Sequence, residues 1–214
     1  MKNNITELVF ILDRSGSMSG LEQDTIGGFN SLIEKQRRQN GKCYVSTVLF
    51  DHETEVLHDR VELSEISKMT ENDYTVRGST ALIDAIGGAI HHIGNIHKYA
   101  REEDVPEHTL FVIMTDGMEN ASRRYTYDRV KKLIEHQKAK YGWEFIFLGA
   151  NIDAAATAVS MGIGRDRAAD YICDKAGTAL NYDVLSKVTS AVRSGAGIDF
   201  DWNSINDDIK RRKR

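Results

Sequence analysis

The chain has 214 residues, of which 41% are hydrophobic and 28% charged, and its net charge is −4. This length predicts one domain that buries its own core, and the composition argues against intrinsic disorder. The negative charge argues against nucleic-acid binding, and no apolar run suits a membrane span or a signal peptide, so we expect a cytoplasmic protein. Cys43 and Cys173 lie in apolar runs without metal-ligand spacing, which predicts free, buried thiols.

Three continuously apolar runs predict the central strands of a parallel sheet: residues 8–12 (LVFIL), 109–114 (TLFVIM) and 145–150 (FIFLGA). Continuous rather than alternating apolar patterns are typical of parallel strands that are covered on both faces. Residues 43–50 predict a fourth strand, and residues 54–63 follow it after three polar residues, too few for a crossover helix. We therefore expect these two segments to form an antiparallel hairpin at one edge of the sheet.

Apolar residues at helical spacing follow several of these strands. They predict helices over residues 21–33, 82–100 and 127–141, then a short helix after residue 153 and a helix over about 176–193. A weaker strand is predicted at residues 170–173 (DYIC). This alternation predicts an α/β fold: a doubly wound, mostly parallel six-stranded sheet with one antiparallel edge strand and helices on both faces.

Residues 194–214 form a C-terminal tail that we expect to be partly flexible, after a domain that spans residues 1–193. Its aromatic residues, Phe200 and Trp202, could dock it on the domain. Alternatively, the tail could stay loose and engage an acidic partner through its basic end, KRRKR. A solvated end is the usual role of such a run, so we do not expect nucleic-acid binding.

Polar motifs follow the predicted strands at the edge where doubly wound sheets bind ligands. Asp13, Ser15 and Ser17 come directly after the first strand, Thr80 precedes a helix within Gly-Ser-Thr, and Asp116 ends another strand within Thr-Asp-Gly. Each motif alone is typical of a helix cap or a turn. Three such motifs at strand-to-helix junctions indicate a common site.

This combination of D-x-S-G-S, a G-x-T threonine and a later T-D-G resembles the metal-ion-dependent adhesion site of von Willebrand factor type A (VWA) domains. The resemblance covers nearly the whole chain and implies a Rossmann-like fold. It implies that Ser15 and Ser17 bind a metal directly, Thr80 directly or through water, and Asp13 and Asp116 mainly through water. Ligands that are all oxygen favour Mg²⁺, with Mn²⁺ or Ca²⁺ as alternatives.

The resemblance also implies a protein-binding module, monomeric by itself, whose metal takes up an aspartate or glutamate of a protein partner. Five residues near the motifs are ordinary loop surface or a rim that contacts this partner: Arg14, Met18, Arg77, Arg123 and Arg124. In the second case, the four arginines form a positive collar that suits an acidic segment.

The alternative function is a metal-dependent hydrolase or phosphatase with Asp13 as its nucleophile. Aspartyl-nucleophile phosphatases place a second aspartate two residues later as general acid, and this chain has Ser15 there. His91, His92 and His97 point in different directions on one helix, so we expect them on a solvated face rather than in a site. We therefore expect no enzymatic activity.

Overall fold

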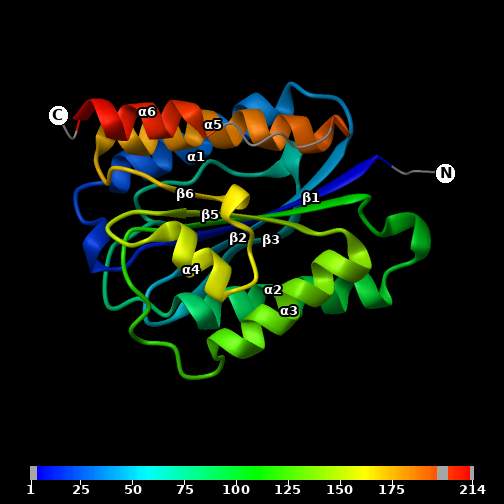
Figure 1. The fold of residues 1–214 in the computed structure, drawn as a ribbon. Helices are drawn as coiled ribbons and strands as arrows, with labels where there is room; N and C mark the ends of the chain where they lie inside the picture. The colour runs from blue at the N-terminus through cyan, green and yellow to red at the C-terminus, as the bar shows by residue number, and fades with distance from the viewer. Residues whose placement is uncertain (1–3, 197–201, 213–214) are drawn as a thin grey trace.

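A computed structural model describes residues 4–196 and 202–212, and it shows one sheet between two layers of helices (Figure 1). The sheet has six strands in the order β3-β2-β1-β4-β5-β6. Their bounds are β1 (Ile5–Asp13), β2 (Lys42–Phe50), β3 (Thr54–Glu62), β4 (His108–Thr115), β5 (Glu144–Gly149) and β6 (Ala168–Asp170). All neighbours pair in parallel except β2 and β3, which form the antiparallel edge hairpin. The predicted fold class is confirmed.

The helices cover both faces of the sheet. On one face lie α1 (Glu22–Arg37), α5 (Lys175–Arg193) and α6 (Asn203–Arg212). On the other lie α2 (Leu82–Tyr99), α3 (Tyr127–Tyr141) and α4 (Ala154–Ser160). Single-turn 3₁₀ helices occur at η1 (Gly16–Met18), η2 (Leu63–Glu65), η3 (Glu102–Asp104) and η4 (Arg165–Arg167). Within the described ranges, none of the helices is both long and apolar enough to cross a membrane.

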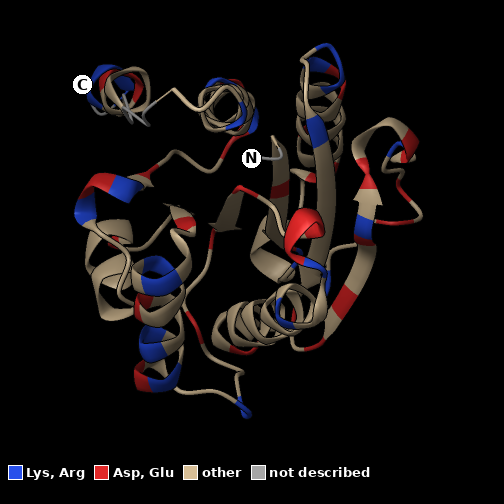
Figure 2. Cartoon of the chain, turned by 90° about the vertical axis from the view of Figure 1, so that its right-hand side faces the viewer, with Lys and Arg blue, Asp and Glu red and all other residues tan. Residues whose placement is uncertain are grey.

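The continuous apolar runs arise because both faces of the central strands are covered. In β1, Leu8 and Phe10 pack in the core beneath α1 and α5, whereas Val9 and Ile11 pack in the core beneath α2. Figure 2 shows the consequence for charge, since the central strands are mostly uncharged and Lys, Arg, Asp and Glu lie mainly on helices and loops. The sheet therefore acts as a rigid support for the residues at its ends.

Two details differ from the sequence-based expectations. The last strand, β6, ends at Asp170 instead of beginning there, and Tyr171 packs into the core after the strand has ended. His97 is not on a solvated face, because its Nε2 lies 3.0 Å from Oε2 of the fully buried Glu7 and its ring meets Trp143 edge to face. The sequence pattern of a segment thus predicts its secondary structure, but it does not predict which residues its side chains contact.

The described part of the C-terminal tail forms α6 and packs on the domain. Trp202 donates its indole N–H to the carbonyl of Asp166 at 2.8 Å, and Ile205 is fully buried. Arg212 forms an ion pair with Asp174 at 2.6 Å. Of the two alternatives for the tail, the structure therefore shows docking through Trp202, while Phe200 lies outside the described residues.

Candidate functional site

The loop after β1 begins with a carboxylate that organises its own turn. Asp13 is the last residue of β1, and its Oδ1 accepts the backbone N–H of Ser15 at 2.7 Å. The backbone N–H of Gly16 then donates to the carbonyl of Gly78 at 3.1 Å. These bonds bring the loop after β1 against the segment that precedes α2, so two of the predicted motifs meet.

A chain of hydrogen bonds joins the first motif to the third. The hydroxyl oxygens of Ser15 and Ser17 lie 3.2 Å apart, and Ser17 Oγ donates to Asp116 Oδ1 at 2.5 Å. Thr115 Oγ1, at the end of β4, donates to the other oxygen of Asp13 at 2.5 Å. β1 and β4 are neighbours in the sheet, which is why residues a hundred positions apart meet at this edge.

Thr80 completes the cluster from the side of α2. A Cβ built on Gly117 would lie 3.2 Å from Ser17 Oγ and 3.3 Å from Thr80 Oγ1, so both hydroxyls border the same small space. The structure thus brings all five predicted site residues together: Asp13, Ser15, Ser17, Thr80 and Asp116.

The charges of this cluster fit a divalent cation. Asp13 and Asp116 are 1% and 2% exposed, and no lysine or arginine of the described ranges pairs with either carboxylate. Burial raises the pKa of Asp13, and the nearby charge of Asp116 raises it further, against the hydrogen bonds from Ser15 and Thr115. Uncompensated carboxylates among neutral hydroxyls are an all-oxygen donor set that suits Mg²⁺, Mn²⁺ or Ca²⁺.

Scans of the sequence against protein-family models and curated proteins gave no match. Solved structures do match. The chain is similar to the vWF domain of the type V pili tip protein Mfa5 from Porphyromonas gingivalis, with a TM-score of 0.64 and 12% identity over 91% of this chain and 96% of that one. It is also similar to the ArnB paralog VWA2 from Sulfolobus acidocaldarius, with a TM-score of 0.53 and 16% identity over 88% of this chain and 45% of that one.

The fold is that of a von Willebrand factor type A domain. A third similar structure is proximal thread matrix protein 1 from the mussel byssus with a zinc-occupied MIDAS motif, where MIDAS denotes the metal-ion-dependent adhesion site. Its TM-score is 0.58, with 11% identity over 86% of this chain and 46% of that one. The chain thus spans about half the length of the mussel protein, and at such low identity the likeness establishes the VWA fold alone.

Sequence reasoning missed the contact of Cys173 with this cluster of candidate ligands. Cys173 is partly exposed rather than buried, and its thiol donates to Asp116 Oδ2 at 3.4 Å. Burial, followed by the charge of Asp116, raises its pKa to about 12, so the sulfur is a neutral thiol. Its position just after β6, at the same edge of the sheet, was the only signal that could have indicated this contact.

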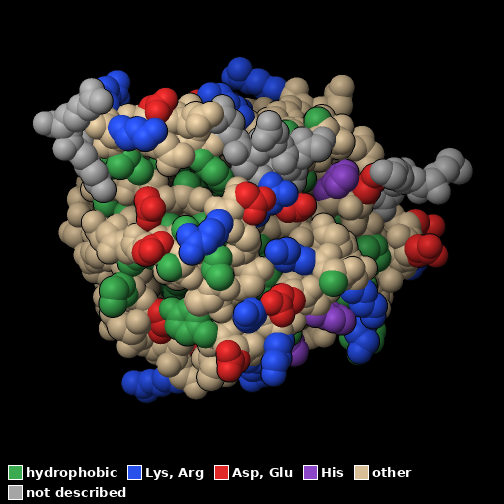
Figure 3. Space-filling model, viewed as in Figure 1, with side chains coloured by type: hydrophobic (Ala, Val, Ile, Leu, Met, Phe, Trp, Pro, Cys, Tyr) green, Lys and Arg blue, Asp and Glu red, His purple; other side chains and the backbone are tan. Residues whose placement is uncertain are grey.

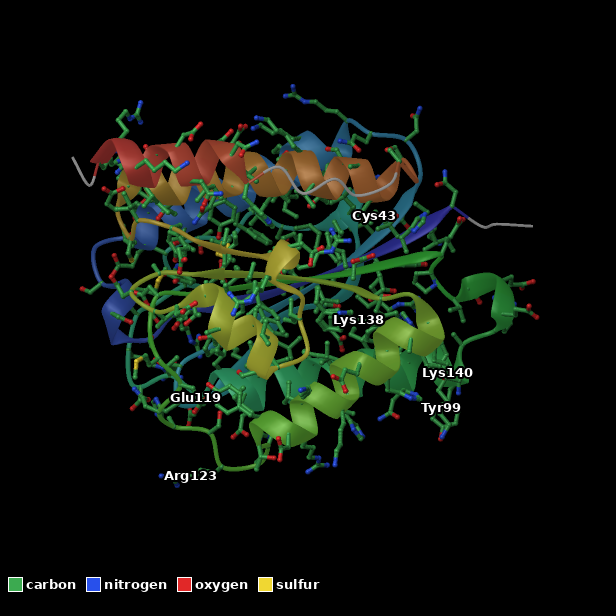
Figure 4. All side chains as sticks on the ribbon, in the orientation of Figure 1. Cys43, Tyr99, Glu119, Arg123, Lys138 and Lys140 are labelled. Atoms are coloured by element: carbon green, nitrogen blue, oxygen red, sulfur yellow. The ribbon has the colours of Figure 1, made fainter. Side chains whose placement is uncertain are left out.

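Sequence reasoning also missed the anchoring of the loop between β4 and α3. Asp84, in the first turn of α2, accepts backbone N–H groups of Arg123, Arg124 and Tyr125. Burial opposes ionisation of Asp84, but these bonds outweigh it and lower its pKa. The loop is therefore fixed to α2, and in Figure 4 Arg123 extends from its outer end while Glu119 lies closer to the body of the domain.

The prediction of a surface rim is wrong for two of the five residues, because the fold buries their side chains. Arg14 is 2% exposed, and it pairs through Nε with Asp51 at 3.0 Å and through Nη1 with Glu55 at 2.6 Å. Met18 is 5% exposed. Neither side chain can contact a partner at the surface, so Arg14 stabilises the edge hairpin instead of forming a collar.

The remaining arginines are accessible to different degrees. Arg77 is half exposed, but it pairs with Asp51 at 2.9 Å and with Glu53 at 3.1 Å. Arg124 lies 3.8 Å from Asp84, whereas no ion pair of Arg123 occurs within the described ranges. The positive collar is therefore reduced mainly to Arg123 and Arg124, because acidic residues of the hairpin neutralise the others.

A second group of possible metal ligands lies in the turn between β2 and β3. One ligand atom from each of Asp51, His52 and Glu53 lies within 4.8 Å of the others. However, Asp51 Oδ2 already accepts from both Arg14 and Arg77. Two guanidinium charges at this carboxylate oppose a cation, so the cluster around Asp13 and Asp116 is the better metal site.

Proposed function

We propose that this VWA domain is a protein-interaction module whose binding depends on a divalent metal ion. The convergence of Asp13, Ser15, Ser17, Thr80 and Asp116 at one edge of the sheet carries the proposal. The three hydroxyls would hold the ion, and the two carboxylates would act mainly through its bound water. The ion, Mg²⁺ or alternatively Mn²⁺ or Ca²⁺, would supply a Lewis-acid position for a ligand from another molecule.

The partner that suits such a site is a protein that presents an aspartate or glutamate. Neutral hydroxyls leave much of the charge of the ion in place, so a carboxylate competes better for it than a neutral donor. A cleft of about 910 Å³ is lined by Ser79 and Ala81, which flank Thr80, and by charged residues of both signs, namely Glu53, Asp84, Arg123 and Arg124. It would give a partner segment room next to the metal site. The exposed arginines would attract an acidic segment over a longer distance than the metal does.

The charge distribution on one face of the domain supports a protein partner rather than nucleic acid. On the face shown in Figure 3, acidic and basic side chains are interspersed and neither sign dominates. We further propose that the domain is monomeric by itself, makes no membrane contact and works in the cytoplasm, where free thiols such as Cys43 and Cys173 are usual. Several structural neighbours are pilus proteins, so cell fractionation is the test of this location.

We propose no catalytic activity for the domain. Asp13, the nucleophile of the alternative hydrolase, is 1% exposed, and both of its oxygens accept hydrogen bonds from Ser15 and Thr115. Such a carboxylate is poorly placed to attack a phosphate, and Ser15 offers no general acid near neutral pH. These features favour binding over hydrolysis.

Titration calorimetry with Mn²⁺ tests the metal site directly. We expect one site in the wild-type protein and a loss of binding in the double variant Ser15→Ala, Ser17→Ala. Ser19→Ala is the matched control, because Ser19 lies exposed in the same loop outside the cluster. Equal Mn²⁺ affinity of the wild type and the double variant would show that the site is misplaced.

Affinity pull-down in Mg²⁺ and in EDTA tests the function. We expect the chelator to release a protein whose contact surface has an essential Asp or Glu. A partner retained equally in EDTA would contradict a metal-dependent attachment.

A further inference from the structure

Thr80 is held by the loop that follows β4, through both of its backbone groups. The backbone N–H of Thr80 donates to Asn120 Oδ1 at 2.9 Å. The carbonyl of Thr80 accepts the backbone N–H groups of Asn120 at 3.0 Å and Ala121 at 3.2 Å. Asn120 and Ala121 thus bond both backbone groups of Thr80, which lies forty positions earlier in the chain.

This contact matters because Thr80 has no regular secondary structure of its own. It lies between Gly78, which has a positive φ of 68°, and the start of α2 at Leu82. The positive φ favours glycine at this position, and a Cβ on Gly78 would lie 2.1 Å from Nδ1 of His52. The orientation of the Thr80 hydroxyl therefore depends on contacts from outside this short segment.

The loop that holds Thr80 is itself fixed on both sides of Asn120. Before it, the carboxylate of Glu119 accepts the backbone N–H of Ile83 at 2.8 Å and that of Ser122 at 2.7 Å. After it, the backbone N–H groups of Arg123 and Arg124 donate to the carboxylate of Asp84. Asn120 is thus held in place, although it is an exposed residue.

We infer that Asn120 is a positioning residue of the proposed metal centre, because its side-chain oxygen holds the backbone of Thr80 so that the Thr80 hydroxyl faces Ser17 and Gly117. The inference rests on the proposed function. Asn120 acts through the backbone of Thr80 and not by contact with the ion. An exposed asparagine used in this way also leaves the core intact when it is replaced.

Two substitutions of Asn120 test whether its side-chain oxygen, as hydrogen-bond acceptor, is what supports metal binding. Asn120→Ala removes the acceptor, and we expect about five-fold weaker Mn²⁺ binding, which corresponds to about 1 kcal/mol. Asn120→Asp keeps an oxygen at this position and adds a negative charge, so we expect Mn²⁺ binding at least as tight as in the wild type. Calorimetry measures both affinities.

Hydrogen exchange of the Thr80 amide in EDTA reports the contact without any metal. We expect the amide to exchange several-fold faster in Asn120→Ala than in the wild type, with protection restored in Asn120→Asp. The thermal midpoint in EDTA should change little, which distinguishes positioning from a general loss of stability.

The outcomes separate the inference from the proposed function. Wild-type protein that binds no Mn²⁺ would overturn the metal site and the inference together. Wild-type protein that binds Mn²⁺ no more tightly than Asn120→Ala would overturn the inference alone. Weaker binding in both Asn120→Ala and Asn120→Asp would also overturn it, because the acceptor would then not be what matters.

Discussion

Replacing Asp13 by asparagine should stabilise the metal-free protein while abolishing its metal binding. Asparagine has the same shape as aspartate, and its side-chain oxygen can still accept the backbone N–H of Ser15. Its amide can face Thr115 Oγ1, which can donate instead to the carbonyl of Gly117 at 3.2 Å. The substitution therefore removes a buried charge with little change in packing.

Opposing contributions set the size of the effect. Burying a carboxylate without a cation costs several kcal/mol, and the two hydrogen bonds to Asp13 recover about 1.5–3 kcal/mol each while it is charged. Burial is the larger contribution, which is why the pKa of Asp13 is raised. We therefore expect Asp13→Asn to gain about 1–2 kcal/mol in EDTA at pH 7, or about 2–8 °C in the thermal midpoint of a domain of this size.

The gain should depend on pH in a direction that the pKa fixes. The pKa of Asp13 is raised in the folded state, so the protonated carboxyl favours folding. Its contribution to stability is complete below the ordinary value of 3.8 and is lost as the pH rises through the raised value. The difference in the free energy of unfolding between Asp13→Asn and the wild type should thus be small near pH 3.8 and largest at neutral pH.

Thermal unfolding followed by circular dichroism, in EDTA and in Mn²⁺, is the assay. Saturation at a hundred times the dissociation constant should stabilise the wild type by about 2.7 kcal/mol, so the order of the two proteins should reverse in Mn²⁺. A variant that is less stable than the wild type in EDTA at pH 7 would refute the view of Asp13 as an uncompensated buried charge. A midpoint of Asp13→Asn that rises with Mn²⁺ as in the wild type would refute its role in the metal site.

Three further predictions concern the rim, the tail and catalysis. Arg14→Ala should lower the free energy of unfolding by about 2–3 kcal/mol, because it leaves the buried Asp51 with fewer partners. Arg123→Ala should leave the free energy of unfolding unchanged, but it should slow association with the partner and flatten the salt dependence of the association rate. Urea unfolding and surface plasmon resonance measure these effects, and equal unfolding midpoints for the two variants would contradict the assignment. Trp202→Ala should lower the free energy of unfolding in urea by about 3 kcal/mol, because Trp202 is only 9% exposed and donates to the carbonyl of Asp166. An unchanged unfolding midpoint would show that the docking of α6 is unimportant for stability. A panel of phosphate and ester substrates with Mg²⁺ or Mn²⁺ should show no turnover, and hydrolysis abolished by Asp13→Asn would favour the alternative enzyme.

Much of this fold could be predicted from the sequence because the decisive signals are local. A run such as residues 109–114 is apolar at every position because a central parallel strand is covered on both faces. Parallel strands share the same direction, so Asp13 and Asp116, each directly after such a run, had to reach the same edge. This geometry brought Asp13 and Asp116 together as candidates, whereas the resemblance to the metal-ion-dependent adhesion site added Ser15, Ser17 and Thr80.

The tertiary structure decided which side chains near that edge are accessible and what they contact. Arg14 follows Asp13 in a polar loop, yet its pairing with Asp51 and Glu55 depends on residues of a neighbouring hairpin. The contact of Asn120 with Thr80 joins positions forty residues apart. Periodicity is a property of consecutive residues, whereas burial and ion pairing depend on segments that only folding brings together, so the sequence determined the positions of the candidate ligands and the fold determined their surroundings.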